Sequence, residues 1–302
     1  MTAPVYVESL NAGDLAKKVK LASAVLGHCV LCPRHCGVDR LNGVTGVCRT
    51  GRHALVASAH PHLGEEPELV GDHGSGTIFF THCSLGCRFC QNSDISRNGV
   101  GQRVDDDALA DIMLDLQAMG CHNINFVTPS HVVPQILAAV HIAAEKGLRV
   151  PLVYNSSGYD AVSTLKILEG VFDIYMPDFK FWDARIADVT CEASDYPEIA
   201  REAIREMHRQ VGVLQTNARG IATRGVIVRH LVLPEDLAGT AAVAKFIATE
   251  LDPGTYVNVM PQYHPCGERS AIDALNRRLK PSEFAAAVAA ARAAGLTRLS
   301  GS

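Results

Sequence analysis

The chain has 302 residues, of which 47% are hydrophobic and 20% charged, and its formal net charge is −4. This balance is typical of a soluble globular protein, long enough for one large α/β domain or two modest ones. The mild acidity gives no sign of a nucleic-acid or membrane-surface partner. No apolar run approaches the roughly 20 residues that span a bilayer, and the N-terminus lacks a signal-peptide core. We therefore expect a cytoplasmic protein.

The N-terminal part of the chain, residues 1–73, looks irregular and rich in glycine. Such a short, loop-rich segment buries little core of its own, so we predict a small N-terminal subdomain over 1–73 that a metal holds together. Its stretch HPHLGEEP, residues 60–67, could close over a substrate or bind a metal. We interpret this stretch as a solvated turn.

A different pattern begins at residue 77, where short apolar runs alternate with amphipathic stretches of helical length. Continuous apolar runs are typical of parallel strands that are buried on both faces. Six βα units imply right-handed crossovers and a partial (β/α)6 barrel over 74–302, with its site at the C-terminal ends of the strands. The predicted strands cover 77–82, 123–129, 150–156, 171–177, 225–234 and 256–263, and the predicted helices cover 105–119, 134–146, 160–169, 196–211, 239–250 and 281–294.

Seven of the ten cysteines fall into two clusters. Disulfides rarely persist in a reducing compartment, so clustered cysteines indicate metal sites. The first cluster supplies four thiolates, which suit either structural zinc or a [4Fe–4S] cluster. A second iron–sulfur cluster could relay electrons or bind substrate, whereas zinc would only hold the subdomain together. The four residues are Cys29, Cys32, Cys36 and Cys48.

The second cluster lies in FFTHCSLGCRFCQNSDIS, directly after the first predicted strand, and contains Cys83, Cys87 and Cys90. Three thiolates on a [4Fe–4S] cluster leave one iron free to coordinate a small molecule. Gly86 allows a tight backbone wrap, and Phe89 could pack over a bound aromatic ring. The alternatives are three buried thiols, or zinc with a distant fourth ligand.

The pattern CxxxCxxC after the first strand of a β/α repeat resembles the radical S-adenosylmethionine (SAM) superfamily. The chain is most similar to the pyruvate formate-lyase activating-enzyme-like branch, and within it to a group with CPRxCGV…GVC near the N-terminus. The resemblance covers about residues 28–295. It implies that the open iron binds SAM, and that an electron from a donor such as flavodoxin or ferredoxin cleaves SAM to methionine and a 5′-deoxyadenosyl radical, which abstracts a hydrogen atom from a substrate.

Two further motifs carry the resemblance into the predicted barrel. MPDFK at the fourth strand is similar to the branch motif hxDhK (h, hydrophobic), which implies that Asp178 and Lys180 contact the ribose or carboxylate of SAM. VRHLVLP at the fifth strand matches the arginine strand of the branch. This match makes Arg229 a candidate partner of the SAM carboxylate.

Other positions depart from the family pattern. NSSG stands where the branch has DTNG, so Asn155, Ser156 and Met176 fall on positions that hold a monovalent cation beside SAM. TPSH replaces a GGEP-like turn, so His131 either points toward the site or belongs to an N-cap turn.

MPQYHP at the sixth strand resembles LPYH of the activating enzymes, which makes Tyr263 a pocket candidate. Cys266, just past this strand, could return a hydrogen atom to a substrate radical or be an inert thiol.

Three functions are compatible with these features. The first is activation of a partner protein by hydrogen abstraction from a backbone glycine. The second is radical chemistry on a small molecule, such as epimerisation, rearrangement, decarboxylation or dehydrogenation. The third is a non-enzymatic iron–sulfur carrier or redox sensor. The fold does not decide between the substrates.

Overall fold

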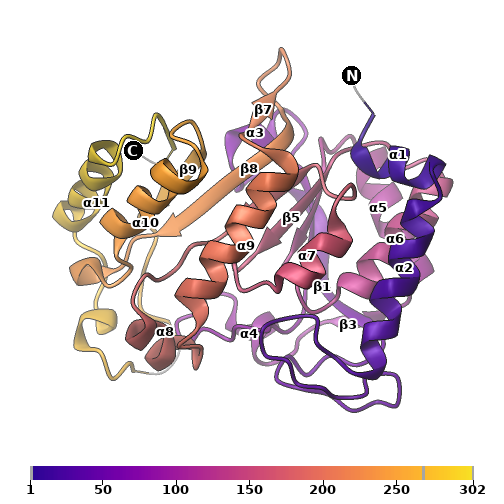
Figure 1. Ribbon diagram of the computed structural model, residues 1–302, viewed down its shortest axis with the longest axis horizontal. Coiled ribbons are helices and arrows are strands. Elements are labelled where there is room, and N and C mark those ends of the chain that lie inside the picture. The colour runs from indigo at the N-terminus through magenta and orange to yellow at the C-terminus, as the bar shows by residue number, and fades with distance from the viewer. Residues whose placement is uncertain (1–2, 267–268, 301–302) are drawn as a thin grey trace.

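The structure is a computed structural model that describes residues 3–266 and 269–300. In these residues the chain forms one sheet with helices packed around it (Figure 1). The ten strands of the described part are β1 (Ala54–His62), β2 (Ser75–Phe80), β3 (Gln102–Val104), β4 (Ile124–Val127), β5 (Leu152–Ser156), β6 (Ile174–Pro177), β7 (Gln215–Thr216), β8 (Ala222–Leu231), β9 (Tyr256–Met260) and β10 (Arg298–Ser300).

Parallel strands make up most of the sheet. The strands follow the spatial order β10-β9-β8-β6-β5-β4-β2-β1-β3, and β7 pairs with β8. Pairing is parallel all the way from β2 to β10. The six predicted strands are β2, β4, β5, β6, β8 and β9, with ends shifted by a few residues. The predicted partial (β/α)6 barrel is confirmed.

Helices connect the parallel strands along the outer face of the sheet. The α-helices are α1 (Val5–Asn11), α2 (Asp14–Ala24), α3 (Pro67–Val70), α4 (Ser93–Ser96), α5 (Asp106–Ala118), α6 (Val133–Glu145), α7 (Val162–Leu168), α8 (Ala184–Cys191), α9 (Tyr196–Val211), α10 (Thr240–Phe246) and α11 (Pro281–Ala293). Adjacent helices pack in pairs, α5 with α6, α7 with α9 and α10 with α11. This outer layer leaves the C-terminal ends of the strands open for a site.

The prediction that residues 1–73 are irregular holds for 28–53, which contain no helix or strand, and is wrong for the described residues on either side of this stretch. They form α1, α2, β1 and α3, and β1 pairs antiparallel with β2 in the main sheet. Tyr6 of α1 and Leu15 of α2 are fully buried in the same hydrophobic core as the barrel helices. Both helices are short, and Gly13 with φ +71° separates them, so the sequence shows no sustained helical period.

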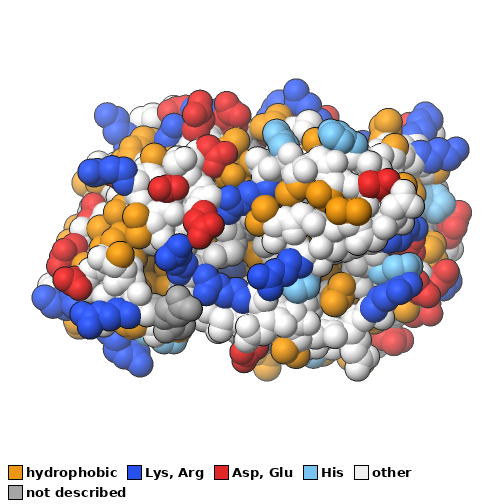
Figure 2. All heavy atoms as spheres, turned by 90° about the horizontal axis from the view of Figure 1, so that it is seen from below, with side chains coloured by type: hydrophobic (Ala, Val, Ile, Leu, Met, Phe, Trp, Pro, Cys, Tyr) orange, Lys and Arg blue, Asp and Glu red, His pale blue; other side chains and the backbone are white. Residues whose placement is uncertain are grey.

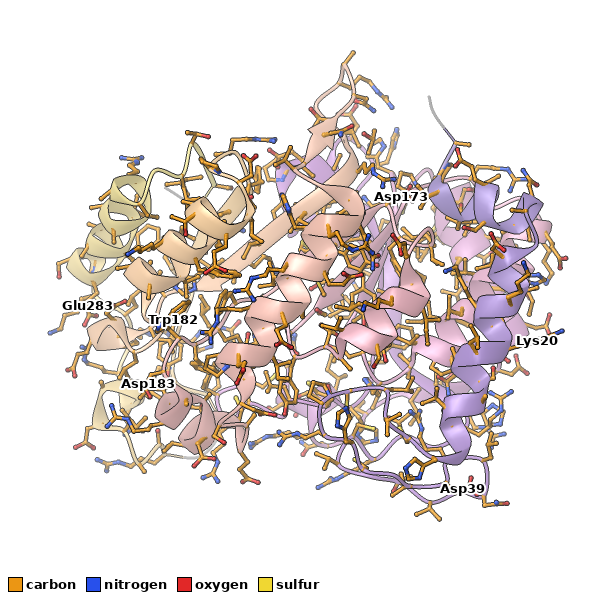
Figure 3. The ribbon with its side chains drawn as sticks, in the orientation of Figure 1. Lys20, Asp39, Asp173, Trp182, Asp183 and Glu283 are labelled. Atoms are coloured by element: carbon orange, nitrogen blue, oxygen red, sulfur yellow. The ribbon has the colours of Figure 1, made fainter. Side chains whose placement is uncertain are left out.

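The start of α1 is fixed by a carboxylate from the barrel. Asp173, just before β6, accepts hydrogen bonds from Val5 N at 2.9 Å and from Leu152 N at 3.1 Å (Figure 3). One buried side chain therefore connects the N-terminal helix to two neighbouring strands.

Helix α3 fills the N-terminal end of the barrel interior. Leu69 is fully buried in the inner cluster that also contains Val153, Ile174 and Met176. The side-chain amide of Asn123, which precedes β4, donates to Leu69 O at 2.9 Å. The interior is thus closed at this end, and a ligand would enter from the opposite end.

No helix in the described ranges is long and apolar enough to cross a bilayer. Figure 2 shows the face that lies at the lower edge of Figure 1, where α4 and α8 are found. Lysine and arginine side chains gather around a hollow near the middle of this face.

Candidate active site

The loop after β2, which we call the three-cysteine loop, carries Cys83, Cys87 and Cys90 at the C-terminal edge of the parallel strands. Gly86 has φ +70°, a conformation that glycine adopts without strain. The loop can therefore turn back on itself between its first two cysteines.

Hydrogen-bond donors approach two of the three sulfurs. The amide of Leu85 donates to Cys83 Sγ at 3.4 Å, and the hydroxyl of Ser96 donates to Cys90 Sγ at 3.2 Å. Such donors stabilise a thiolate. Burial raises the pKa of the Cys83 thiol to about 12, so a bound metal would have to displace the proton.

A fourth cysteine lies beside the three-cysteine loop. Cys191, at the end of α8, has its side chain next to Cys87, and this neighbour together with burial raises the pKa of Cys87. The amide of Arg88 donates to Thr190 O at 2.9 Å and holds α8 against the loop. A lone cysteine so far along the chain gives no spacing signal in the sequence.

One cavity of about 150 Å³ joins the three-cysteine loop to the ends of the next strands. All three cysteines of the loop line it. Asp178, Lys180 and Arg229, which were predicted to contact SAM, also line it. So do Asn155 and Ser156, which fall on positions of the monovalent cation.

Buried charges form a network in this cavity. Asp178 lies 2.5 Å from Lys180 Nζ and 3.3 Å from Arg229 Nε. Burial acts to raise the pKa of Asp178, but the two cations outweigh it, so this pKa is lowered. Arg229 also contacts Glu65 Oε2 at 3.0 Å and Asn155 Oδ1 at 3.3 Å. The network presents two cations and carboxylate acceptors, which suits a ligand with a carboxylate, hydroxyls and an amine.

Glu65 is a residue that sequence analysis placed wrongly. HPHLGEEP was interpreted as a solvated turn, but the side chain of Glu65 is only 7% exposed. Glu66 is buried as well, and its Oε1 accepts from Asn258 Nδ2 at 2.8 Å. The segment between β1 and α3 therefore enters the barrel interior, and only the long-range pairing of β1 with β2 brings it there.

The hydroxyl of Ser156 is already engaged within the protein. It donates to Asp160 Oδ2 at 2.6 Å and accepts from Gly158 N at 3.1 Å. Tyr154 OH also donates to Asp160, at 2.9 Å. Ser156 thus shapes the turn after β5 as well as lining the cavity.

The turn TPSH after β4 directs its first and last residues to different places. Thr128 lines the cavity with φ +61°, an unusual conformation for a β-branched residue, and its amide donates to Asn155 O at 2.9 Å. His131 is fully buried elsewhere, and its Nε2 lies 2.9 Å from Thr81 O. Of the two alternatives for His131, the one that points it into this cavity is wrong; the turn leads into α6, whose N-cap is Val132.

Two more predicted cofactor-binding residues are absent from the cavity lining. Phe89 packs edge-to-face against Phe181 and Tyr263, with ring centroids 5.9 and 5.8 Å apart. Met176 is fully buried in the inner cluster with Leu69. Both side chains thus pack against protein groups rather than facing this cavity.

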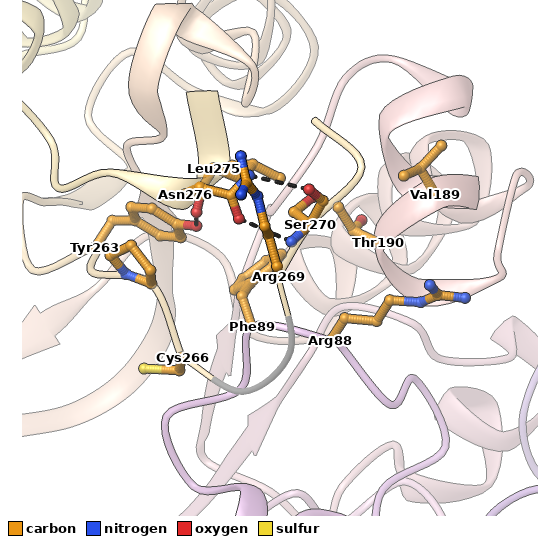
Figure 4. A pocket seen from close by; sticks show the side chains of 11 residues that line it. Arg88, Phe89, Val189, Thr190, Tyr263, Cys266, Arg269, Ser270, Leu275 and Asn276 are labelled. Carbon is orange, nitrogen blue, oxygen red and sulfur yellow. Dashed lines mark hydrogen bonds between the residues drawn. The ribbon is translucent and has the colours of Figure 1, made fainter. Parts of the chain in front are cut away.

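A second pocket of about 500 Å³ lies next to the three-cysteine loop (Figure 4). Phe89, Tyr263 and Cys266 line it together with Arg88 and Arg269. Its volume is in the range of small-molecule sites.

The hydroxyl of Tyr263 donates to Leu275 O at 2.7 Å. Burial raises the pKa of Tyr263 to about 12. This side chain is therefore a neutral wall of the second pocket, while the thiol of Cys266 is half-buried there.

The four N-terminal cysteines meet around a separate cavity. Cys29, Cys32, Cys36 and Cys48 all line it. Gly46 is needed there, because a Cβ at this position would lie 2.6 Å from Cys36 Sγ. Burial raises the pKa of Cys32 to about 12, so this thiol also needs a metal to lose its proton near neutral pH.

Comparisons with known proteins agree with this geometry. Residues 77–226 match the model of the radical SAM superfamily. The uncharacterized protein MJ0674 of Methanocaldococcus jannaschii is 30% identical over 285 residues, which cover 92% of this chain and 78% of MJ0674. The crystal structure of HydG, a maturase of the [FeFe]-hydrogenase, is similar with a TM-score of 0.51 and 13% identity. This match covers 74% of the present chain and 51% of HydG, so the chain spans about half of HydG and the likeness concerns the fold.

A partial β/α barrel with an open three-cysteine loop at its C-terminal edge defines a class of iron–sulfur proteins. Together with these matches, it shows that the chain belongs to the radical SAM superfamily. Membership implies a [4Fe–4S] cluster and SAM as cofactors.

Proposed function

We propose that this protein is a radical SAM enzyme whose three-cysteine loop holds the [4Fe–4S] cluster, with SAM bound by Asp178, Lys180 and Arg229. The cluster, when bound, supplies the electron that cleaves SAM. The observation that carries the proposal is the single cavity that these three residues share with all three thiols. Arg229 offers a cation to the SAM carboxylate, and Asp178 offers an acceptor to hydroxyl groups.

Reductive cleavage of SAM tests this proposal. Protein reconstituted without oxygen and then reduced should release 5′-deoxyadenosine and methionine, and Cys87→Ala should abolish the release. Cys121→Ala is the matched control, because Cys121 lines neither cysteine cavity. A fully loaded, reduced protein that releases no 5′-deoxyadenosine would favour the iron–sulfur carrier or redox sensor instead.

The substrate is a second question, and two candidates remain. The likeness to the activating-enzyme branch favours hydrogen abstraction from a glycine of a partner protein. The pocket of about 500 Å³ beside Cys266 favours a small molecule, with the thiol as hydrogen donor. The protein fraction and the small-molecule fraction of a cell extract should be compared for their effect on 5′-deoxyadenosine release. If only one fraction stimulates the release, that fraction identifies the class of substrate. If the substrate is a small molecule, Cys266→Ala should stop substrate turnover while SAM cleavage continues; if it is a protein, Cys266→Ala should have no such effect.

We also propose that an acidic one-electron donor of the flavodoxin or ferredoxin kind docks on the basic face of Figure 2. A groove of about 500 Å³ there is lined by both Cys48 and Cys83. Four arginines surround it, and in the described residues only Arg88 has a carboxylate partner, Glu192 at 3.0 Å. The four are Arg34, Arg49, Arg88 and Arg97.

Charge reversal tests this docking surface. Arg97→Glu should slow reduction by the protein donor several-fold at low salt, while reduction by dithionite should be unchanged. Arg292→Glu, on the exposed face of α11, is the control. Equal slowing by both substitutions would place the donor elsewhere.

Finally, we propose that the four N-terminal cysteines bind a second metal centre. Four thiols from two separate segments line one cavity, which suits a closed site for structural zinc or for an iron–sulfur cluster. Metal content of the purified protein, measured by elemental analysis, tests this. Intact protein with nothing bound beyond the cluster of the three-cysteine loop would refute it.

A further inference from the structure

We infer that the four-cysteine centre is a redox-active iron–sulfur cluster, that Arg40 is its counter-cation, and that Arg40 and His131 connect it to the three-cysteine loop. This inference rests on the second metal centre proposed above and names its kind, its neighbours and its role.

Arg40 is a buried cation that has no carboxylate partner among the residues that the structure describes. Its side chain is among the largest fully buried ones, with the residue 1% exposed. Its nitrogens donate to Gly51 O at 2.9 and 3.1 Å and to His131 O at 2.8 Å, and Nη1 lies 3.8 Å from Cys29 Sγ. A guanidinium stays protonated in proteins, and a buried charge without a counter-charge is strongly destabilising.

The cavity beside Arg40 can supply that counter-charge. Four thiolates on a divalent ion or on a [4Fe–4S] cluster form a centre with net negative charge. The sulfur of Cys29 is the contact between this centre and the guanidinium. Arg40 therefore indicates, independently of cysteine spacing, that the cavity holds metal-bound thiolates rather than neutral thiols.

His131 supplies a second sign that the cavity is a ligand site. Its Nε2 lies 2.9 Å from Thr81 O, and a carbonyl only accepts, so Nε2 carries the proton and Nδ1 the lone pair. Nδ1 is buried and, within the described residues, has no hydrogen-bond partner. The residue lines the same cavity as the four cysteines. An unpartnered buried acceptor is costly, so a donor in the cavity is expected beside Nδ1, such as a water that donates one hydrogen to the ring and the other to a metal-bound sulfur.

The spread of the four sulfurs favours a cluster over a single ion. Zinc requires all four sulfurs at about 2.3 Å from one point. In the part of the chain that the structure describes, no group of three or more His, Cys, Asp or Glu side chains is placed to hold one metal ion. The four cysteines nevertheless line one small cavity, of about 10 Å³, so they meet around a common centre at separations larger than a single ion allows.

The same residues lead to the three-cysteine loop. Thr81, which contacts His131, lies two positions before Cys83. Cys48 of the four-cysteine centre and Cys83 also line one groove. We therefore assign an electron-relay role: an external one-electron carrier reduces the four-cysteine centre, which then loses one electron as the cluster of the three-cysteine loop gains one.

The first experiment replaces Cys83, Cys87 and Cys90 by alanine and counts iron, sulfide and zinc after anaerobic reconstitution. About four irons and four sulfides should remain. One zinc without iron would overturn the inference. If this variant does not fold, the metal content of the wild type answers the question. About eight irons per chain would support the inference, whereas about four irons and one zinc would overturn it.

The second experiment measures the midpoint potential of the remaining centre by EPR-monitored titration. Arg40→Gln should lower the potential, because removing a positive charge favours the more oxidised, less negative centre, and Arg40→Lys should lower it less. Arg52→Gln is the control, since Arg52 is half-exposed and pairs with Asp106. An unchanged potential in Arg40→Gln would overturn the role of Arg40.

A stability comparison covers the case in which Arg40→Gln does not assemble a cluster. Arg40→Met should lower Tm in the cysteine-intact protein. It should lower Tm less, or raise it, when all four N-terminal cysteines are serine, because Arg40 then lacks its counter-charge. An equal loss of Tm in both cysteine backgrounds would overturn the pairing of Arg40 with the metal-bound thiolates. SAM cleavage is measured separately. If the protein retains the second cluster but does not cleave SAM, the proposed enzyme function is refuted and this inference still holds.

Discussion

Arg229 Nη1 donates to Glu65 Oε2 at 3.0 Å, although 164 positions separate the two residues in the chain. Glu65 comes from the segment that enters the barrel interior before α3, and Arg229 comes from β8. Burial raises the pKa of Glu65, while Arg229 opposes this shift. The cation proposed for the SAM carboxylate is therefore shared with a carboxylate of the protein itself.

Replacing Glu65 by glutamine should strengthen SAM binding several-fold. The substitution keeps the size of the side chain but removes a negative charge that competes for Arg229. Anaerobic equilibrium dialysis gives the Kd, and Glu68→Gln is the control, because Glu68 accepts from Tyr256 OH instead. Weaker or unchanged SAM binding in Glu65→Gln would show that Arg229 does not hold the SAM carboxylate.

Gly158→Ala should destabilise the protein by about 3 kcal/mol through overpacking and a strained backbone. Gly158 has φ +75°, and a Cβ there would lie 2.2 Å from Asp178 O. SAM binding should weaken as well, since Asp178 would have to move. Gly147→Ala is the control: Gly147 has φ +104° but open space around it, so a loss of about 1 kcal/mol is expected. Chemical denaturation measures the free energy of unfolding of both variants. Equal losses would contradict the predicted clash between the new Cβ and Asp178 O.

Cys191→Ala should retain the cluster and SAM cleavage, whereas Cys87→Ala should lose both. Cys191 lies next to Cys87, but the open iron requires that only three cysteines ligate the cluster. Iron content and 5′-deoxyadenosine release are the measurements. Loss of iron in Cys191→Ala would identify this residue as a fourth ligand and remove the basis for SAM binding at an open iron.

Asp173 should make the stability of the protein depend on pH. Burial raises the pKa of Asp173 to about 6 from 3.8. The folded state thus binds this proton more tightly than the unfolded state. The stabilisation is fully present below about 3.8 and is lost as the pH rises through about 6. Between pH 4 and 7, wild type should therefore lose about 2 kcal/mol relative to Asp173→Asn. Chemical denaturation gives the free energy of unfolding of both proteins at each pH. Parallel pH profiles would contradict a raised pKa for the buried Asp173 carboxyl.

The sequence was sufficient to predict the six βα units, because parallel strands and their helices have local periodic patterns. It also placed Asp178, Lys180 and Arg229 correctly at one end of the sheet, since each follows or ends a strand there. The sequence did not predict the direction of every side chain. Thr128 turns the chain with φ +61°, and the buried ring of His131 then packs toward Thr81.

Long-range contacts account for the other errors. The burial of Glu65 depends on the antiparallel pairing of β1 with β2, and β1 is rich in alanine and ends in His-Pro-His, which does not resemble a strand. Phe89 packs against Phe181 and Tyr263, and no spacing in the sequence indicates that these rings meet. The role of Arg40 likewise appears only when its burial and its missing carboxylate are known.

The central claim is that the three-cysteine loop leaves one iron open for SAM. Low-temperature EPR of the reduced protein with and without SAM tests this most directly. We predict that SAM changes the spectrum of one cluster in wild type, and that Cys83→Ala abolishes the change. A fully loaded wild-type protein whose spectrum does not respond to saturating SAM would contradict the account.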